Sequence, residues 1–296
     1  MSFTGLERAI ILSISYSSIF SHPLSCPEIW LRLVIRKPVF YKKVREALSE
    51  LVSKKIIITD GQYYTLSDST FFSIRKKRHQ LSLSKRSEAT LFVKKARLIP
   101  FVKALIITGS VSVNNAKEND DIDWLIITQK HTLWIVRPLV ILLATFFGKR
   151  RERNGNHRDN SWCFNMFLSE DCLQVADKNK NIYTAYEVFQ ADFVYDQNNI
   201  ESKFLGENSW VKKYLPNYWL EKNKKIDLIE SSNCKKISNK DLSFFSIINK
   251  LLFFIQYQYM KKAITREVVQ INKALFHPRN THGEVLKKWK EIVRDV

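Results

Sequence analysis

The sequence is poor in the residues that break or cross-link a chain. Its 296 residues include only 7 glycines and 7 prolines, which excludes a collagen-like chain or a protein made mostly of linkers. The 4 cysteines form no CxxC pair, so neither a disulfide framework nor a zinc ribbon is expected. Reduced, mostly buried thiols are typical of a cytoplasmic protein, and we expect this localisation. The cysteines are Cys26, Cys163, Cys172 and Cys234.

Long apolar runs are also missing. The run at 139–147 is too short for a membrane span, which needs about 20 apolar residues. The run at 242–260 is longer, but polar side chains such as Lys250 interrupt it. The first residues lack the basic stretch, apolar core and cleavage site of a secretory signal. We therefore expect a soluble protein with no membrane partner.

Negative charge is scarce, because 29 Asp+Glu stand against 48 Lys+Arg and leave a net charge of +19. Such an excess attracts nucleic acid, nucleotides or an acidic membrane surface. Hydrophobic residues make up 45% of the chain, which indicates a globular protein and not a disordered one. The length favours about two domains of ordinary size.

Residues 1–69 are predicted to form a winged helix-turn-helix. Apolar residues at helical spacing predict a helix over 6–20, and Ser25 with Glu28 forms a capping box for a second helix. A third helix is expected from about residue 38, with an apolar stripe that begins at Phe40. Asp60–Gly61 lies between two β-rich runs and predicts a hairpin.

The third helix of a winged helix-turn-helix is the one that enters the DNA major groove. Its polar face here carries three basic residues, which are candidate nucleic-acid contacts: Lys42, Lys43 and Arg45. Modules of this kind also pack against their own chain or against another protein, so the fold alone does not fix this role.

A basic connector is expected at 70–99, formed by one or two amphipathic helices. Residues 70–103 hold ten basic residues against the single acid Glu88. A charge run of this kind is often only a solvated helix face. The imbalance nevertheless favours a surface that faces a polyanion.

The most informative segment, residues 104–128, combines a glycine–serine pair with two aspartates. An apolar run at 104–108 predicts a buried strand, which Gly109–Ser110 ends, and a second strand is expected at 121–128. Asp121 and Asp123 stand two residues apart, so both side chains leave the same face of that strand. Because carboxylates in an apolar strand are costly unless compensated, a divalent cation is expected beside them. Oxygen ligands favour Mg²⁺ or Mn²⁺.

Gly109 and Ser110 predict a phosphate-binding turn. Glycine lets a phosphate approach the backbone, N–H groups at the start of a following helix face an anion, and Ser110 adds a hydroxyl donor. Two aspartates at a strand entry also occur in simple turns. Asp120 is expected to serve such a turn and not to bind a metal.

Together these residues resemble the signature of the DNA polymerase β-like nucleotidyltransferase superfamily, and most closely its minimal-nucleotidyltransferase branch. The resemblance covers about residues 100–196 and rests on Gly109–Ser110 followed by Asp121–Ile122–Asp123. More loosely, the chain resembles bacterial proteins with a winged helix before a nucleotidyltransferase domain. The resemblance implies that Asp121 and Asp123 hold Mg²⁺ at the nucleotide phosphates, which Gly109 and Ser110 bind. The reaction would be attack of an acceptor hydroxyl on the α-phosphorus with release of pyrophosphate.

The superfamily usually supplies a third carboxylate from a neighbouring strand, and this chain departs from that pattern. The candidate strand at 161–168 carries Asn165 at its centre, and an amide is a poor base. We expect Asn165 beside Asp121 and Asp123. The spacing does not choose among four nearby carboxylates that could replace the missing one: Asp159, Glu170, Asp171 and Glu187.

The rest of the chain is predicted to be mostly helical. A helix is expected at 131–147, from which Arg137 could reach a phosphate, and a long helix at 242–271. The long helix is expected to pack over the nucleotidyltransferase sheet, with a homodimer interface as the alternative. The six histidines show no metal-binding spacing.

We therefore expect an α+β protein with a winged helix at 1–69, a connector at 70–99, a mixed-sheet nucleotidyltransferase domain at 100–200 and a helical domain at 201–296. The favoured function is Mg²⁺-dependent transfer of a nucleoside monophosphate from a nucleoside triphosphate to an unidentified acceptor. The alternative is a regulator without catalysis that senses a nucleotide or binds DNA through the winged helix. In either case the expected partners are a nucleoside triphosphate and DNA or RNA.

Overall fold

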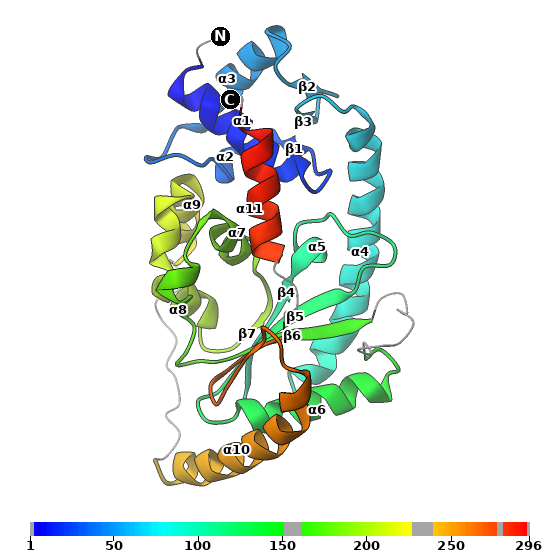
Figure 1. Cartoon of the computed structure of the whole chain (residues 1–296), viewed down its shortest axis with the longest axis vertical. Coiled ribbons are helices and arrows are strands. Elements are labelled where there is room, and N and C mark those ends of the chain that lie inside the picture. Colours follow the sequence, from blue (N-terminus) through cyan, green and yellow to red (C-terminus); the bar gives the residue numbers. More distant parts are fainter. Residues whose placement is uncertain (1–2, 151–160, 227–238, 277–280, 295–296) are drawn as a thin grey trace.

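The computed structural model describes residues 3–150, 161–226, 239–276 and 281–294 (Figure 1). Residues 5–65 form three helices around a small antiparallel sheet, in which the strand order is β1-β3-β2. Ile10, Ile14, Leu48 and Leu51 are among the apolar side chains that fill the core between them. The elements are α1 (Gly5–Ser18), β1 (Leu24–Ser25), α2 (Cys26–Leu31), α3 (Tyr41–Ser53), β2 (Ile58–Thr59) and β3 (Tyr63–Thr65).

Local sequence signals account for these elements. Glu28 accepts hydrogen bonds from the backbone N and the Oγ of Ser25, both at 2.8 Å, and so caps α2. The hairpin turns at Asp60, whose Oδ1 accepts from the backbone N of Tyr63 at 2.9 Å. Phe40 was expected to begin the apolar stripe of α3. It does not, because it precedes the helix and is 81% exposed.

The basic connector is one helix, α4 (Thr70–Ala96), which runs from the small sheet to the large one (Figure 1). Three of its basic side chains have structural roles. Arg75 and Lys85 are buried, and each donates to backbone carbonyls of the loop between residues 113 and 120. Arg86 donates to the carbonyls of Val111 and Ser112. The expectation of a polyanion-facing surface is therefore wrong for these three residues, because their charge binds this protein's own carbonyl oxygens.

A mixed six-stranded sheet with the order β7-β4-β5-β6-β9-β8 forms the centre of the molecule. β4 is antiparallel to β5 and β7, whereas β5 and β6 are parallel. The protein is thus an α+β fold with a mixed sheet, as expected. The strands are β4 (Val102–Thr108), β5 (Ile122–Thr128), β6 (Trp162–Ser169), β7 (Asp192–Asp196), β8 (Val268–Gln270) and β9 (Lys273–Leu275).

Each face of the sheet carries its own apolar core. Trp124 and Ile126 of β5 belong to the core shared with α4 and α6 (Leu133–Phe146). Leu125 and Ile127 point to the opposite core, which contains Tyr186 of α7 (Ile182–Gln190). Because side chains alternate along a strand, Asp123 emerges on the α7 face. This alternation decides which helices can contribute to a site at Asp123.

The remaining helices surround these two cores. Figure 1 shows α11 lying between α1 and α7, and the indole Nε1 of Trp289 in α11 donates to the carbonyl of Leu12 at 3.2 Å. They are α5 (Gly109–Ser112), α8 (Ile200–Glu207), α9 (Pro216–Ile226), α10 (Asn239–Met260) and α11 (Thr281–Ile292), with short 3-10 turns at Asp177–Asn179, Ser209–Lys213 and Lys261–Ala263.

The C-terminal part is not purely helical, which corrects the sequence prediction. The long helix α10 ends at Met260, and residues 268–275 instead form a hairpin whose strand β9 extends the large sheet beside β6. α10 packs on α6, where Asn249 Oδ1 accepts from the backbone N of Trp134 at 2.8 Å. No helix in the described ranges is both long and apolar enough to cross a bilayer.

The outer face of α10 is apolar and exposed. Its six large side chains follow helical spacing, so they share one stripe. A homodimer interface on this stripe stays a prediction. The residues are Phe244, Ile247, Leu251, Phe254, Ile255 and Tyr259.

Candidate functional site

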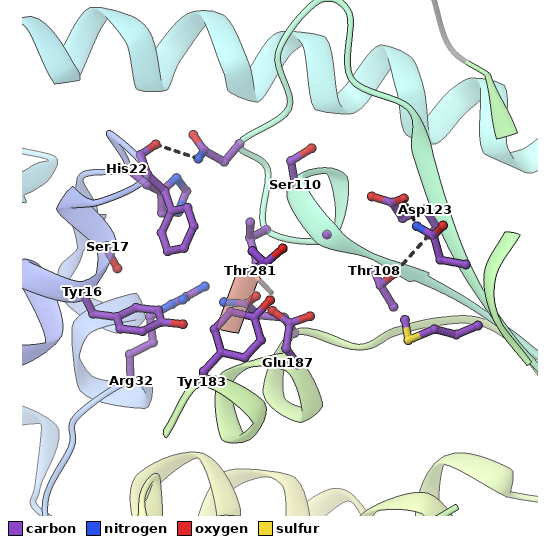
Figure 2. A pocket seen from close by; sticks show the side chains of 17 residues that line it. Tyr16, Ser17, His22, Arg32, Thr108, Ser110, Asp123, Tyr183, Glu187 and Thr281 are labelled. Atoms are coloured by element: carbon purple, nitrogen blue, oxygen red, sulfur yellow. Dashed lines mark hydrogen bonds between the residues drawn. The ribbon is translucent and has the colours of Figure 1, made fainter. Parts of the chain in front are cut away.

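A cavity of about 330 Å³ lies between the N-terminal helices and the α7 face of the large sheet (Figure 2). One wall comes from the end of β4 and from β5 and β6, and it contains Gly109, Ser110, Asp123 and Asn165. The facing walls come from α7 and from the N-terminal module. The structure therefore brings four of the residues singled out in the sequence into one cavity.

Gly109 is fixed by its conformation and by its neighbour. Its φ of +66° lies in the left-handed region that favours glycine. A Cβ added there would lie 2.6 Å from Oδ2 of Asp123, closer than a van der Waals contact allows. The close approach of this backbone to the carboxylate is therefore possible only for glycine.

Ser110 has its hydroxyl directed at Asp120. Its Oγ donates to Oδ2 of Asp120 at 2.7 Å, and the same oxygen accepts from the backbone N of Lys117 at 2.9 Å. Asp120 thus holds the loop together, as expected for a turn residue. The helix that was expected to follow this turn is α5, which has only four residues.

Asn165 contacts Asp123 directly. Its Nδ2 donates to Oδ1 of Asp123 at 2.6 Å, while its own Oδ1 lies 2.9 Å from the Sγ of Cys163. The register between β5 and β6 shifts between Asp123 and Leu125, because β6 has one more residue than β5 in this interval. Such a β-bulge redirects a side chain, and here it brings Asn165 to the carboxylate.

Asp121 and Asp123 differ in position. Asp121 immediately precedes β5 and is half-buried, whereas Asp123 lies within the strand opposite Thr108 of β4. Asp123 lines the cavity, and Asp121 is not among the lining residues. The strand was expected to begin at Asp121, but β5 begins at Ile122, so strand alternation places only Asp123 on the α7 face.

Of the three alternative carboxylates that the structure describes, Glu187 is the one that lines the cavity (Figure 2). Burial, assisted by the negative charge of Asp123, raises its pKa to about 7. Glu170 accepts a hydrogen bond from the backbone N of Lys130, and Asp171 accepts one from Oγ of Ser169. Both carboxylates therefore lie at the C-terminal end of β6, away from the cavity. Asp159 lies outside the described residues.

A signal for Glu187 was present in the sequence. It is the only charged residue in the nine residues of α7, IYTAYEVFQ, and an isolated acid in an apolar helix is unusual unless it is paired or used. The spacing around Asp121 gave no means of placing this helix over the strand.

The N-terminal module supplies the wall that sequence reasoning missed. Tyr16, His22 and Arg32 line the cavity opposite Asp123 (Figure 2). His22 is buried beside Arg75, which lies 3.0 Å from its Nδ1. Burial and the positive charge of Arg75 hold the pKa of His22 well below its usual value, so the ring is neutral.

A second, more apolar cavity of about 420 Å³ adjoins the first. Both are lined by Thr108, Met166, Tyr183, Glu187 and Thr281. Glu187 therefore lies at the boundary between the first cavity and the more apolar second cavity.

The other candidate residues lie away from the cavity. Lys42, Lys43 and Arg45 are exposed on α3. Arg137 donates from Nη1 to Oε1 of Gln256 at 2.7 Å, and burial lowers its pKa to about 10. Arg137 lines neither of the two cavities, so it is not placed to reach a phosphate at Gly109–Ser110.

Within the described part of the chain, no group of three or more His, Cys, Asp and Glu side chains is arranged to hold a metal ion. Comparison of the whole chain with family models, with curated proteins and with solved structures finds no significant match.

Proposed function

We propose that the protein is a Mg²⁺-dependent nucleotidyltransferase, with a nucleotidyltransferase domain behind a winged helix. The observation that carries the proposal is the contact between Gly109 and Asp123. A glycine in a conformation that side chains avoid brings a backbone turn against a carboxylate, with no room for a Cβ. Glycine at this turn would let a phosphate approach the backbone beside a carboxylate that is suited to Mg²⁺.

The residues present suit Mg²⁺ that arrives with a nucleotide. Mg²⁺ keeps several waters and is commonly held by one or two carboxylates together with substrate phosphates, so three protein carboxylates are not needed. Asp121 and Asp123 would hold the ion. When bound, it would neutralise phosphate charge and orient the triphosphate.

Phosphate binding would fall to the Gly109–Ser110 turn. The hydroxyl of Ser110 has a single proton, which it donates in a hydrogen bond to Asp120 in this structure. Binding a phosphate through this hydroxyl therefore requires it to turn from Asp120 to the ligand.

Glu187 takes the role of the missing base in this proposal. The acceptor hydroxyl attacks the α-phosphorus, its proton passes to Glu187, and the bond to the β-phosphate breaks with loss of pyrophosphate. A carboxylate with a pKa of about 7 suits a general base near neutral pH. Asn165 holds Asp123 in place through its hydrogen bond and takes no proton itself.

A DNA-binding regulator is the second candidate, and the exposed basic residues of α3 favour it. Lys42, Lys43 and Arg45 stand near the start of the third helix of a three-helix module with a β-hairpin. In a winged helix this end of the helix meets the major groove.

The test of the enzyme is incubation with each α-labelled nucleoside triphosphate, Mg²⁺ and cell extract, with measurement of pyrophosphate release and label transfer. The wild type should transfer label, and Asp121→Asn and Asp123→Asn should each lower the rate at least 100-fold. Asp177→Asn, on an exposed turn outside the cavity, is the matched control and should retain full activity. Equal transfer by wild type and Asp123→Asn would refute the assignment.

A further inference from the structure

Arg32 is a buried cation whose backbone is held in place from two sides. It follows α2 and is only 5% exposed. Its carbonyl oxygen accepts hydrogen bonds from Oγ of Ser13 at 3.0 Å and from Oη of Tyr186 at 2.9 Å. Its guanidinium carbon lies 4.9 Å from the ring centroid of Phe189. The arginine is thus fixed between α1 and α7.

The guanidinium has no counter-ion among the residues that the structure describes. Among the described residues, no carboxylate oxygen lies within 4.0 Å of it, and its buried Nε has no hydrogen-bond partner. Glu28 is the nearby acid that acts on it electrostatically, but Oε1 of Glu28 binds Arg75 at 2.8 Å. A buried cation without a partner lowers stability, and burial lowers the pKa of Arg32 accordingly.

Arg75 shows what a structural arginine in the same module looks like. It is as deeply buried as Arg32, yet it pairs with Glu28 and donates to the carbonyls of Val113 and Asn114. Arg32 makes none of these contacts and instead faces the cavity. The difference indicates that the partner of Arg32 is a ligand and not part of the fold.

The cavity is electrostatically asymmetric along its length. Arg32 lies on one side and Asp123 on the other (Figure 2). His22, which lies near Arg32, is neutral because burial and Arg75 lower its pKa. A ligand that fills the cavity therefore meets the carboxyl groups of Asp123 and Glu187, together with the single positive charge of Arg32.

We propose that Arg32 binds an oxyanion, a phosphate or carboxylate group, of the ligand that occupies this cavity. The planar guanidinium suits two parallel hydrogen bonds to such a group. Only the origin of this oxyanion rests on the proposed function. If the protein is a nucleotidyltransferase, the oxyanion belongs to the phosphate tail of the nucleotide or to an anionic acceptor. In both cases the ligand joins the N-terminal module to the sheet, because Arg32 and Asp123 come from different parts of the chain.

The first test compares wild type, Arg32→Gln, Arg32→Lys and the control Arg97→Gln, an exposed arginine outside the cavity. Calorimetric titration with inorganic pyrophosphate in Mg²⁺-free buffer should show affinity at least 10-fold weaker for Arg32→Gln. Arg32→Lys should lie between it and the wild type, and Arg97→Gln should bind like the wild type. No binding by the wild type, or equal binding by wild type and Arg32→Gln, overturns the proposal.

Thermal unfolding without ligand separates a binding role from a structural one. Since Arg32→Gln removes an unpaired buried charge, its unfolding midpoint should equal or exceed that of the wild type. A midpoint several degrees lower than that of the wild type would show that Arg32 supports the fold, and would overturn the proposal.

A third titration, with a non-hydrolysable triphosphate and Mg²⁺, identifies the source of the oxyanion. Weaker binding to Arg32→Gln assigns the phosphate tail of the nucleotide. Unchanged binding, with pyrophosphate affinity still lost, assigns an anionic acceptor. Failure of label transfer by the wild type, with pyrophosphate binding still dependent on Arg32, would refute the proposed enzyme but leave this site standing.

Discussion

Asn165 donates a hydrogen bond to Asp123, with 2.6 Å between Nδ2 and Oδ1. The contact joins β5 to β6, the strand in which the sequence resemblance led us to expect a third carboxylate. Because an amide nitrogen donates and cannot accept a proton, Asn165 orients Asp123 in the absence of a metal. A carboxylate in its place would repel Asp123 unless a cation stood between them.

Asn165→Asp should therefore make the fold dependent on Mg²⁺. Without the ion, two carboxylates in contact should lower the free energy of unfolding by about 1 to 3 kcal/mol. Addition of Mg²⁺ should restore most of the loss, whereas the wild type should change little. Denaturant unfolding with EDTA and with Mg²⁺ measures both effects. An Asn165→Asp protein that Mg²⁺ does not stabilise would argue against a metal at Asp123.

Gly109→Ala should displace Asp123. The new Cβ would lie 2.6 Å from Oδ2 at a φ of +66°, so both strain and a clash arise, and strain of this kind costs about 1 to 3 kcal/mol. Gly148→Ala is the matched control, because Gly148 has a φ of +62° and no atom within 4 Å of its added Cβ. Both variants should lose stability, but only Gly109→Ala should lose affinity for a Mg²⁺–triphosphate complex. Similar affinities in the two variants would contradict the role given to Gly109.

Glu187→Gln should lower the rate of transfer by about 10² to 10⁴-fold, as expected for loss of a general base. The affinity for nucleotide should change less than about threefold, since the amide retains the shape of the side chain. Glu170→Gln provides the comparison, because Glu170 binds Lys130 at the other end of β6. Single-turnover kinetics and nucleotide titration separate the two effects. Equal rates in the two variants would mean that Glu187 is not the base.

His22 should make the fold sensitive to mild acid. Its folded pKa lies well below the ordinary value of 6.5, because of burial and the charges of Arg75 and Arg32. The unfolded chain therefore binds a proton below pH 6.5 that the folded chain does not, and stability falls as pH falls. From pH 7 to pH 5 this contribution is about 2 kcal/mol.

Replacement of His22 by glutamine should remove this contribution, so the stability of His22→Gln should fall less between pH 7 and pH 5. His131→Gln, in the turn before α6, is the control and should keep the slope of the wild type. Denaturant unfolding at four pH values is sufficient. Parallel slopes in wild type and His22→Gln would show that His22 is protonated in the fold.

The exposed basic residues of α3 are the proposed site of DNA contact. In the triple variant Lys42→Gln/Lys43→Gln/Arg45→Gln, affinity for duplex DNA should fall at least 10-fold. The slope of log K against log salt should become shallower by about 2 to 3, since each phosphate contact contributes about 0.9. Lys94→Gln/Lys95→Gln, on the exposed face of α4, should bind like the wild type. Equal loss in both variants would indicate nonspecific attraction to a basic protein.

Short-range signals in the sequence predicted much of this structure. The capping pair Ser25–Glu28 and the turn at Asp60 act within four residues, so they are readable from the chain alone. Gly109 and Asp123 were found for a related reason, because glycine and paired aspartates are costly in a buried strand unless they have a use. The strand alternation then placed Asp123 on one face.

Long-range contacts were beyond such reasoning. The carbonyls bound by Arg75 and Lys85 lie about 35 residues further along the chain. From the sequence alone, the charges of these two residues therefore predicted a surface for polyanions. Glu187 and Arg32 enter the cavity only because α7 and the N-terminal module pack over the same face of the sheet. The hairpin at 268–275 was missed because its short strands follow an apolar helix without a clear break.

The measurement that tests the central claim most directly is the anomalous diffraction of a crystal grown with Mn²⁺ and a non-hydrolysable triphosphate. We expect an anomalous peak at about 2 Å from the carboxylate oxygens of Asp121 and Asp123, with the triphosphate against Gly109 and Ser110. Occupied triphosphate with no Mn²⁺ at these aspartates, or Mn²⁺ and triphosphate bound outside this cavity, would contradict the account.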